Sequence, residues 1–310
     1  MNNLNIRDRI VQFIGTLPET VSVKAYGSSI AYQSGYSENE KKQVDLIVIV
    51  NDIKKFYEEN LKANKYMYKL VPKFYFKHAT AKGLKKAAGI CYTTDINYGI
   101  DTFKMGVIEK QDVLDDLLNW KTFYIAGRFQ KEMYTALEDK EIEKANEVNK
   151  RNALTIALLL LKKDNPTLID LYEQICSLSY MGDSRKSFKA EDPNKIKKLA
   201  SGSKEHFNKE FRDKTTLIKV SKDEHIEIDY KKVFKEIDKL PEELRNNINS
   251  RTEGKNDLDH IEEIREEITN YLTEIIKKSS LGQTKKGILT TGPKNSISYA
   301  LRKLKKGRKK

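Results

Sequence analysis

The sequence is poor in cysteine, proline and tryptophan, with two, six and one of these residues among 310. The two cysteines, Cys91 and Cys176, are far apart and do not have the spacing of metal ligands. A secreted domain stapled by disulfides and a cysteine-based metal site are therefore excluded. Both thiols are expected to be reduced and buried in the core.

Long apolar runs are also absent. The longest, residues 153–161, is interrupted by Thr155 and is much shorter than the roughly 20 residues that a membrane-spanning helix needs. The first residues, MNNLNIRDRIVQF, have the spacing of a helix and not the pattern of a signal peptide. We therefore expect a cytoplasmic protein of two or three domains, and the absence of a leader favours a bacterial source.

Acidic residues are outnumbered, because 58 Lys and Arg against 45 Asp and Glu give a net charge of +13. This charge favours an anionic partner: a nucleotide, a nucleic acid or an acidic lipid. The excess is concentrated at the end of the chain, since residues 281–310 contain no acid and many Lys and Arg. The alternative interpretation of this segment is a solvated, frayed tail.

Apolar spacing predicts strands and helices in a mixed order, which indicates an α/β or α+β fold. Strands are expected at residues 21–25, 44–50, 89–92, 102–108 and 225–230. Helices are expected at residues 4–14, 52–68, 111–126, 138–164, 167–180 and 258–278.

The first two strands frame the most informative segment, VKAYGSSIAYQSGYSENEKKQVDLIVIV. Its turn, Gly27-Ser28-Ser29, can cradle a phosphate with backbone N–H groups, the more so if a helix begins at Ile30. Asp45 opens the apolar run LIVIV, so its carboxylate is expected at a strand edge where a divalent metal ion can bind. Together these features favour nucleotidyl transfer. The general pattern has a second acid two residues later on the same strand face, and here that position is Ile47.

A longer series of ordered motifs resembles the mitochondrial-type phosphatidate cytidylyltransferases, the translocator assembly and maintenance family. The resemblance covers most of the chain and is strongest in DLLNWKTFYIAGRFQK at residues 116–131. The other matching pieces are YGS (26–28), VDL (44–46), ND (51–52), NLKAN (60–64), KMGVI (104–108), LSYMGDSR (178–185), DPNKI (192–196) and KGILTTGPKNSISYALRKL (286–304).

This resemblance implies a metal-dependent transferase that joins CTP to phosphatidic acid, giving CDP-diacylglycerol and pyrophosphate in phospholipid biosynthesis. It also implies a nucleotidyltransferase domain followed by a winged-helix-like domain. Together with the mixed order of strands and helices, this predicts an α+β architecture in three parts. These are a nucleotidyltransferase domain with a mixed sheet (1–135), a mainly helical, winged-helix-like domain (136–257), and a C-terminal helix with a basic tail (258–310).

By the same resemblance, Gly27, Ser28 and Ser29 bind the triphosphate of CTP, and Asp45 binds Mg²⁺, with Mn²⁺ or Co²⁺ as alternative ions. The source of a second carboxylate is left open. Three acids are candidates: Asp116, Asp52 and Asp101. Asp116 ranks first because it lies in the strongest matching block.

The implied reaction brings two anions together, so the site needs fixed cations more than it needs a base. The predicted catalytic cations are Lys104 and Arg128. The predicted binding residues beside the Gly-Ser turn are Lys121, Lys131, Asp183 and Arg185. Each cation can also be read as an ordinary surface charge, and Asp183 as a residue that caps or orients a neighbour. Two aromatic residues of the strongest block are expected in the core: Trp120 and Tyr124.

Phosphatidate lies in a bilayer, so the enzyme must attach to one. Residues 295–306 have an apolar stripe flanked by Lys and Arg, which is the pattern of a helix that lies at a membrane interface. We therefore expect peripheral contact with the inner face of an anionic membrane, weakened by salt. Two other functions are open: a nucleotidyltransferase acting on RNA or protein, and a winged-helix-like nucleic-acid binder without enzymatic activity. Nucleic acid is not the expected partner, because the tail has a single aromatic residue, Tyr299, for stacking.

Overall fold

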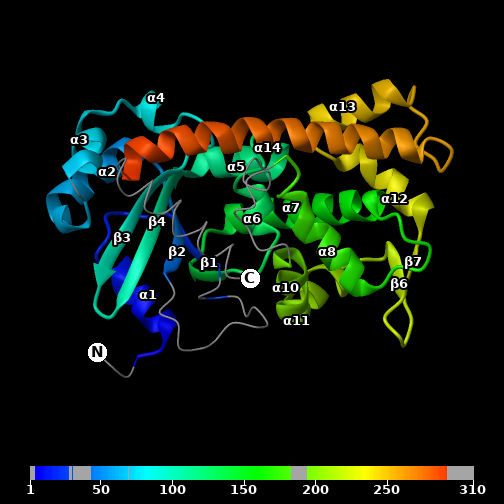
Figure 1. Cartoon of the computed structure of the whole chain (residues 1–310), viewed down its shortest axis with the longest axis horizontal. Coiled ribbons are helices and arrows are strands. Elements are labelled where there is room, and N and C mark those ends of the chain that lie inside the picture. Colours follow the sequence, from blue (N-terminus) through cyan, green and yellow to red (C-terminus); the bar gives the residue numbers. More distant parts are fainter. Residues whose placement is uncertain (1–3, 28–29, 31–42, 69, 183–193, 292–310) are drawn as a thin grey trace.

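The protein has two halves, one built on a five-stranded sheet and the other mainly helical (Figure 1). The computed structural model describes residues 4–27, 30, 43–68, 70–182 and 194–291. One long helix, α14 (Ile261–Thr291), runs along both halves. The mixture of a sheet and many helices confirms the α+β class.

The sheet is mixed, with strand order β3-β4-β2-β1-β5. The central strand β2 pairs in parallel with β4 and antiparallel with β1, while β3 and β5 join the two outer edges antiparallel. A central strand is covered on both faces, which explains the apolar run of β2. The strands are β1 (Ser22–Tyr26), β2 (Val44–Val50), β3 (Cys91–Tyr98), β4 (Asp101–Glu109) and β5 (Tyr134–Leu137).

Successive side chains of β2 point into two different cores, as expected for a strand. The even-numbered residues of 44–50 belong to a core under the helices of the first half, and Ile47 and Ile49 belong to a larger core on the other face. By this alternation, Asp45 lies on the face that carries the larger core. The elements on the first face are α1 (Ile6–Ile14), α2 (Ile53–Ala63), η1 (Lys65–Met67), α3 (Leu70–His78) and α4 (Ala81–Leu84).

The larger core is continuous from the sheet through the second half to α14. Helices α5 (Lys110–Asn119), α6 (Ala126–Phe129) and α7 (Lys140–Leu160) carry it from one half to the other. The second half continues with α8 (Leu168–Leu178), α10 (Lys195–Gly202), α11 (Lys204–Phe207), the π-helical turn η2 (Asn208–Arg212), β6 (Ile218–Val220), β7 (Ile226–Ile228), α12 (Tyr230–Glu236), η3 (Ile237–Lys239) and α13 (Glu242–Arg251).

The expected single helix at residues 111–126 is wrong. Helix α5 ends at Asn119, and Trp120 takes a left-handed conformation with φ of 50°. The carboxylate of Asp116 accepts the backbone N–H groups of the loop that follows, which gives those groups an alternative to helical hydrogen bonds. Gly127 does not end the helix but lies within the short helix α6.

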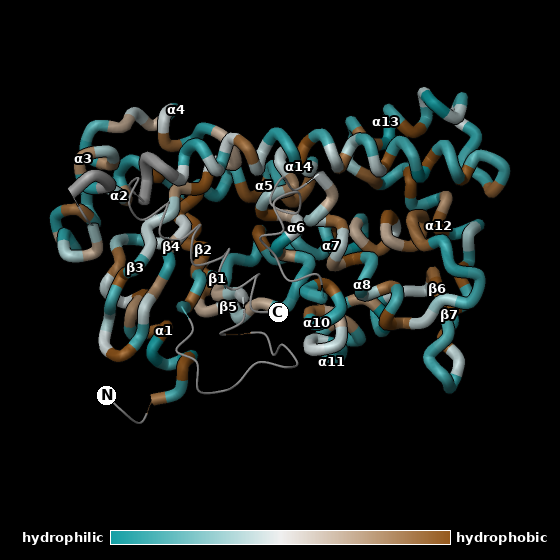
Figure 2. Tube along the Cα trace, in the orientation of Figure 1, coloured by the Kyte–Doolittle hydropathy of each residue, from teal (hydrophilic) through white to brown (hydrophobic). Residues whose placement is uncertain are grey.

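Helix α14 is longer than the predicted helix at 258–278 and connects distant parts of the chain. Near its start, Arg265 donates to the carbonyl groups of Leu159, in the last turn of α7, and of Leu161 just after it. Near its other end, Gln283 donates to the carbonyl oxygen of Ile90 just before β3, at 2.9 Å. Figure 2 shows hydrophilic and hydrophobic residues alternating along the helix. This spacing gives the helix an apolar stripe that can pack against both halves.

Most other expected elements are confirmed with small shifts at their ends, but the strand expected at 89–92 is β3 at Cys91–Tyr98, and the helix expected at 52–68 ends at Ala63. The predicted helix at 167–180 is α8, and Thr167 and Asp170 form its capping box. Both cysteines are free and buried, and burial raises the pKa of Cys176 to about 12. No helix in the described part of the chain is long and apolar enough to cross a membrane. The predicted interfacial helix at 295–306 lies outside the described residues.

Candidate active site

The structure brings Asp45 and the glycine turn together. Tyr26, the last residue of β1, pairs with Asp45 on β2, and Gly27 follows directly. Gly27 has φ of +86°, a conformation that favours glycine, and a Cβ atom there would lie 3.2 Å from Oδ2 of Asp45. The N–H of Ile30 donates to the carbonyl of Gly27 at 3.0 Å and closes the turn. Ser28, Ser29 and a helix beginning at Ile30 lie outside the described residues.

Lys104 is held beside this carboxylate by the parallel pairing of β2 with β4. Lys104 on β4 is the sheet partner of Asp45 on β2, and the Nζ of Lys104 lies 3.1 Å from Oδ1 of Asp45. The Lys104 ammonium also lies 4.5 Å from the ring centroid of Tyr92, a cation–π contact. Gly106 makes room for that ring, because a Cβ at this position would lie 2.6 Å from Cε1 of Tyr92.

Arg128, on the short helix α6, lies over the ring of Tyr124, with Cζ 3.8 Å from the ring centroid. Its guanidinium also donates to the carbonyl of Tyr124. Burial alone would lower the pKa of Arg128, but the hydroxyl groups of Tyr124, Tyr92 and Tyr26 outweigh it and raise this pKa above its ordinary value. Arg128 therefore stays charged within reach of all three hydroxyl groups.

These tyrosines connect Arg128 to the Asp45 end of the site. The hydroxyl of Tyr124 donates to that of Tyr92 at 3.4 Å. Burial raises the pKa of Tyr26, while the charges of Lys104 and Arg128 oppose the shift. Burial also raises the pKa of Tyr92 well above its ordinary value, so these hydroxyl groups are neutral near pH 7 and can donate hydrogen bonds.

Sequence reasoning missed Tyr26 and Tyr92. The available signal was weak: Tyr26 precedes the glycine of a matching piece, whereas Tyr92 is in no matching piece and becomes visible only when β3 is paired with β4.

Lys131 lies where the two halves meet. Its Nζ donates to the hydroxyl of Ser179 at 2.5 Å and lies 4.7 Å from the ring centroid of Tyr180. The end of α8 approaches α6 closely here, because a Cβ at Gly127 would lie 2.6 Å from the Cβ of Ser179. Burial lowers the pKa of Lys131.

Two predicted residues have other partners in the structure. The buried carboxylate of Asp116 accepts five hydrogen bonds from the loop at 122–126, at 2.6 to 3.0 Å, so its oxygens are used to shape that loop. Lys121 is 63% exposed and pairs with Asp115 at 3.3 Å. The structure does not bring either residue to Asp45.

The other two acids considered as second carboxylates are also engaged. Asp52 caps α2 by accepting the N–H groups of Lys54 and Lys55, at the opposite end of β2 from Asp45. Asp101 forms an ion pair with Arg9 at 2.6 Å. The described residues contain no group of three or more His, Cys, Asp or Glu arranged to hold a metal ion. The last two predicted residues, Asp183 and Arg185, lie outside the described residues.

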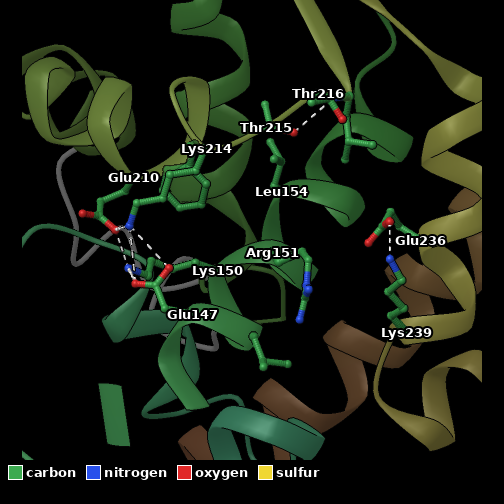
Figure 3. A pocket seen from close by; sticks show the side chains of 13 residues that line it. Glu147, Lys150, Arg151, Leu154, Glu210, Lys214, Thr215, Thr216, Glu236 and Lys239 are labelled. Carbon is green, nitrogen blue, oxygen red and sulfur yellow. Dashed lines mark hydrogen bonds and ion pairs between the residues drawn. The ribbon is translucent and has the colours of Figure 1, made fainter. Parts of the chain in front are cut away.

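A separate pocket with a volume of about 370 Å³ lies in the second half (Figure 3). None of the predicted site residues that the structure describes lines it. Its lysines already have acid partners, so it is a poor candidate for binding an anionic substrate. The ion pairs join Lys150 and Lys214 to Glu147 and Glu210, and Lys239 to Glu236.

Comparison with known proteins identifies similar sequences along almost the whole chain. The model of the family described as "Phosphatidate cytidylyltransferase, mitochondrial" matches residues 10–306. The enzyme of that name from Xenopus laevis is 31% identical over 319 aligned positions, which cover 96% of this chain and 93% of the relative. The one from Caenorhabditis briggsae is 30% identical, with 96% and 98% covered. The one from Schizosaccharomyces pombe is 39% identical over 184 residues, which are 59% of this chain but only 47% of that longer relative.

Proposed function

The chain belongs to the family of mitochondrial phosphatidate cytidylyltransferases, and we propose that it transfers the cytidylyl group of CTP to phosphatidate. The products are CDP-diacylglycerol and pyrophosphate, which makes the protein a transferase of phospholipid biosynthesis. The structural observation that carries the proposal is the juxtaposition of Gly27, Asp45 and Lys104 at the edge of the central strand.

The chemistry requires charge compensation. An oxygen of the phosphatidate phosphate attacks the α-phosphorus of CTP, a new P–O bond forms, and the bond to the bridging oxygen of the β-phosphate breaks. Pyrophosphate carries away the electron pair of that bond. Because both reactants are anions, fixed positive charges near the α-phosphate lower the barrier. Lys104 and Arg128 are the proposed catalytic cations.

Asp45 is the proposed metal ligand, and its surroundings fit that role. Its carboxylate is 27% exposed and lies beside the turn proposed to take the triphosphate. Mg²⁺ is commonly held by one or two carboxylates together with phosphate oxygens and water, so a single aspartate at a nucleotide site is sufficient. When bound, Mg²⁺, or Mn²⁺ or Co²⁺ in its place, would neutralise negative charge on the triphosphate.

The remaining residues bind and orient the substrates. Gly27 is the proposed backbone donor at the triphosphate, and Ser28 and Ser29 keep this role from the family resemblance. Asp183 and Arg185 keep the binding role in the same way. Lys121 is left out of the proposed site, because its exposed ammonium already pairs with an acid.

We also propose the three-part organisation at 1–135, 136–257 and 258–310, with a winged-helix-like second part. The order of elements supports the winged-helix assignment. Thr167 forms an antiparallel bridge with His225, next to β7 of the β6–β7 hairpin. Helices α8 and α10 lie in the sequence between Thr167 and this hairpin. A helix pair followed by a small hairpin is the arrangement expected of a winged helix.

Membrane attachment remains a proposal that follows from the substrate. A lipid substrate requires peripheral contact with a bilayer, and the acid-free stretch at 281–310 is suited to an anionic inner face. Several cations near such a surface give reversible binding that weakens as salt rises.

The test is product formation from CTP with vesicles that contain phosphatidate, followed as labelled CDP-diacylglycerol. D45N is expected to lower kcat by about 100-fold or more, because the ligand for the metal loses its charge. D8N, which changes an exposed acid on α1, is the matched control and should keep wild-type activity. Thermal unfolding checks that D45N is folded. Turnover that depends on RNA or a protein acceptor in place of phosphatidate would refute the proposal, and so would a folded D45N with full activity.

A further inference from the structure

The first half contains a long stretch without acids. Residues 60–94 include eight lysines and no Asp or Glu, and their helices α3 and α4 lie near one end of the molecule (Figure 1). The acids of the preceding helix α2 already have lysine partners on that helix, since Glu58 pairs with Lys54 and Glu59 with Lys55. Six lysines of the stretch are exposed and form no ion pair with an acid among the described residues: Lys62, Lys65, Lys73, Lys77, Lys82 and Lys86. The stretch therefore gives the first half a basic surface.

Helix α3 combines an aromatic ring with lysines on its exposed side. Its inner side is fixed to the core, because Phe76 is fully buried and stacks on Tyr57 of α2, with ring centroids 3.9 Å apart. Phe74 lies on the other side of the helix and is 68% exposed, although it is a large apolar residue. The exposed residues Lys73 and Lys77 lie next to it on the helix surface.

A second exposed ring precedes α3 in the chain. Tyr66 of η1 is 57% exposed, and the exposed Lys65 is its neighbour. A single exposed apolar side chain is ordinary in a folded protein, but two large rings within an acid-free, lysine-rich stretch are not. Aromatic rings accompanied by lysines are the composition of segments that lie at a membrane interface, where the rings enter the headgroup region and the ammonium groups bind anionic lipids.

The end of α14 brings a second acid-free stretch to the first one. Gln283 donates to the carbonyl of Ile90, and the ammonium of Lys286 donates to the carbonyl of Leu84. The described start of the acid-free stretch 281–310 therefore packs directly against residues of the stretch 60–94, although the two are far apart in the sequence. An anionic surface that attracts one of them is brought close to the other, so the two contacts reinforce each other.

From these observations we propose that η1 and the exposed side of α3 form a docking surface for an anionic bilayer. Phe74 and Tyr66 enter the headgroup region, and the lysines around them bind lipid phosphates. The inference rests on the proposed function, because a lipid substrate requires contact with a bilayer, and it deepens that function by assigning part of the contact to the folded first half. Single-stranded nucleic acid also binds aromatic rings and lysines, and it is included in the experiment as the competing partner.

The first test measures whether residue 74 enters a bilayer. The full chain carrying F74W is bound to vesicles of phosphatidylcholine with about 30% phosphatidylglycerol. The emission of the new indole is expected to shift to the blue and to be quenched by lipids brominated in their acyl chains. Trp120 is fully buried in the core, so the wild type should show neither change. L258W, at a leucine of the second half that is 57% exposed, is the matched control and should not be quenched. Vesicle-bound F74W without quenching would overturn the inference.

The second test measures binding to the same vesicles by co-sedimentation. K73E/K77E is expected to weaken the partition of the full chain onto vesicles by about tenfold or more at low salt, because two cations at the lipid surface become anions. F74S should weaken it by about fivefold, because the inserted ring is lost. K231E/K235E makes the same charge change at two exposed lysines of α12 and should weaken binding by less than about threefold. An equal loss in the two double variants would mean that binding follows net charge alone, which would also overturn the inference.

Turnover separates this inference from the proposed function. With dihexanoyl phosphatidate, a soluble lipid that needs no bilayer, K73E/K77E should keep the wild-type kcat and KM, whereas with phosphatidate in vesicles its activity should fall together with its binding. If the wild type forms no CDP-diacylglycerol but F74W is quenched on vesicles, the docking surface stands and the proposed function fails. If K73E/K77E and F74S lose binding to single-stranded RNA and keep vesicle binding, the surface belongs to a nucleic acid and the inference is overturned.

Discussion

At the scale of single residues, the site depends on two glycines, whose lack of a side chain makes room for neighbouring groups. Gly27 leaves space beside Oδ2 of Asp45, and Gly106 leaves space for the ring of Tyr92 under Lys104. The ammonium of Lys104 is thereby fixed between an aromatic face and a carboxylate. Fixed charges of this kind do not have to reorganise when the substrate arrives, which is the condition for electrostatic catalysis.

Asp116 illustrates the opposite case, a residue whose motif suggested chemistry and whose contacts indicate structure. D116N is expected to lower the free energy of unfolding by about 2–4 kcal/mol, because an amide group would face N–H groups that now donate to a carboxylate. The Mg²⁺ concentration for half-maximal activity should not change. Urea unfolding and a Mg²⁺ titration measure the two effects, with D115N, at a partly exposed acid of the same helix, as the control. A raised Mg²⁺ requirement at unchanged stability would instead make Asp116 a metal ligand.

At the scale of elements, sequence patterns predicted the strands and helices that obey a simple period. β2 was predicted with its observed ends, since a central strand reads as one apolar run. The helix at 111–126 was predicted as one piece because its apolar spacing continues past Trp120, whereas the hydrogen bonds of Asp116 that break it are set by tertiary structure. The tyrosines of the site were missed for a similar reason, because only strand pairing and the approach of α8 to α6 bring them together.

The packing of α7 on the turn η2 has a pH dependence that can be measured. Although burial opposes it, hydrogen bonds from Lys150 and Lys214 lower the pKa of Glu210 from its ordinary 4.5 to about 2. A carboxyl group whose pKa is lower in the folded state contributes its full stabilisation at pH values above its pKa in the unfolded chain. For Glu210 this stabilisation is lost as the pH falls through about 4.5 toward 2. E210Q should therefore be less stable than wild type at pH 7 by at most about 3 kcal/mol, and the difference should shrink below pH 4.

Urea unfolding of both proteins between pH 7 and pH 3 checks this prediction, and E205Q, an exposed acid on α11, provides the control. A stability difference that is constant across this range would mean that Glu210 acts by packing and not by its charge.

At the scale of the whole molecule, the two halves share one core, which was not predicted from the sequence. The predicted parts are divided at 135 and 257, but the larger core runs from the sheet through α7 and α8 to α14. The candidate site lies at this junction, with Asp45 and Lys104 from the sheet and, beside Lys131, Ser179 and Tyr180 from the second half. A site assembled from both halves requires that they keep a fixed relation, and α14 is the element that spans them (Figure 1).

Lys286 near the end of α14 is the residue that most directly ties the helix to the first half. Its buried ammonium donates to the carbonyl groups of Leu84, the last residue of α4, and of Lys86 just after it. K286A is expected to lower the free energy of unfolding by about 1–3 kcal/mol, because both carbonyl groups would lose a charged donor and keep only the Cys91 thiol and the Gly89 N–H. K285A, an exposed neighbour on the same helix, should stay within about 0.5 kcal/mol of wild type.

The single tryptophan makes the coupling of the halves observable. Trp120 is fully buried in the shared core and donates to Asn149 of α7 at 3.0 Å, so its fluorescence reports on the junction. Because the core is continuous, we expect its urea transition to coincide with that of far-UV circular dichroism in the wild type and in K286A. Two separated transitions in the wild type would mean that the halves unfold independently. In that case α14 would not be the coupling element, and a site built across the junction would lose its geometry before the protein lost its fold.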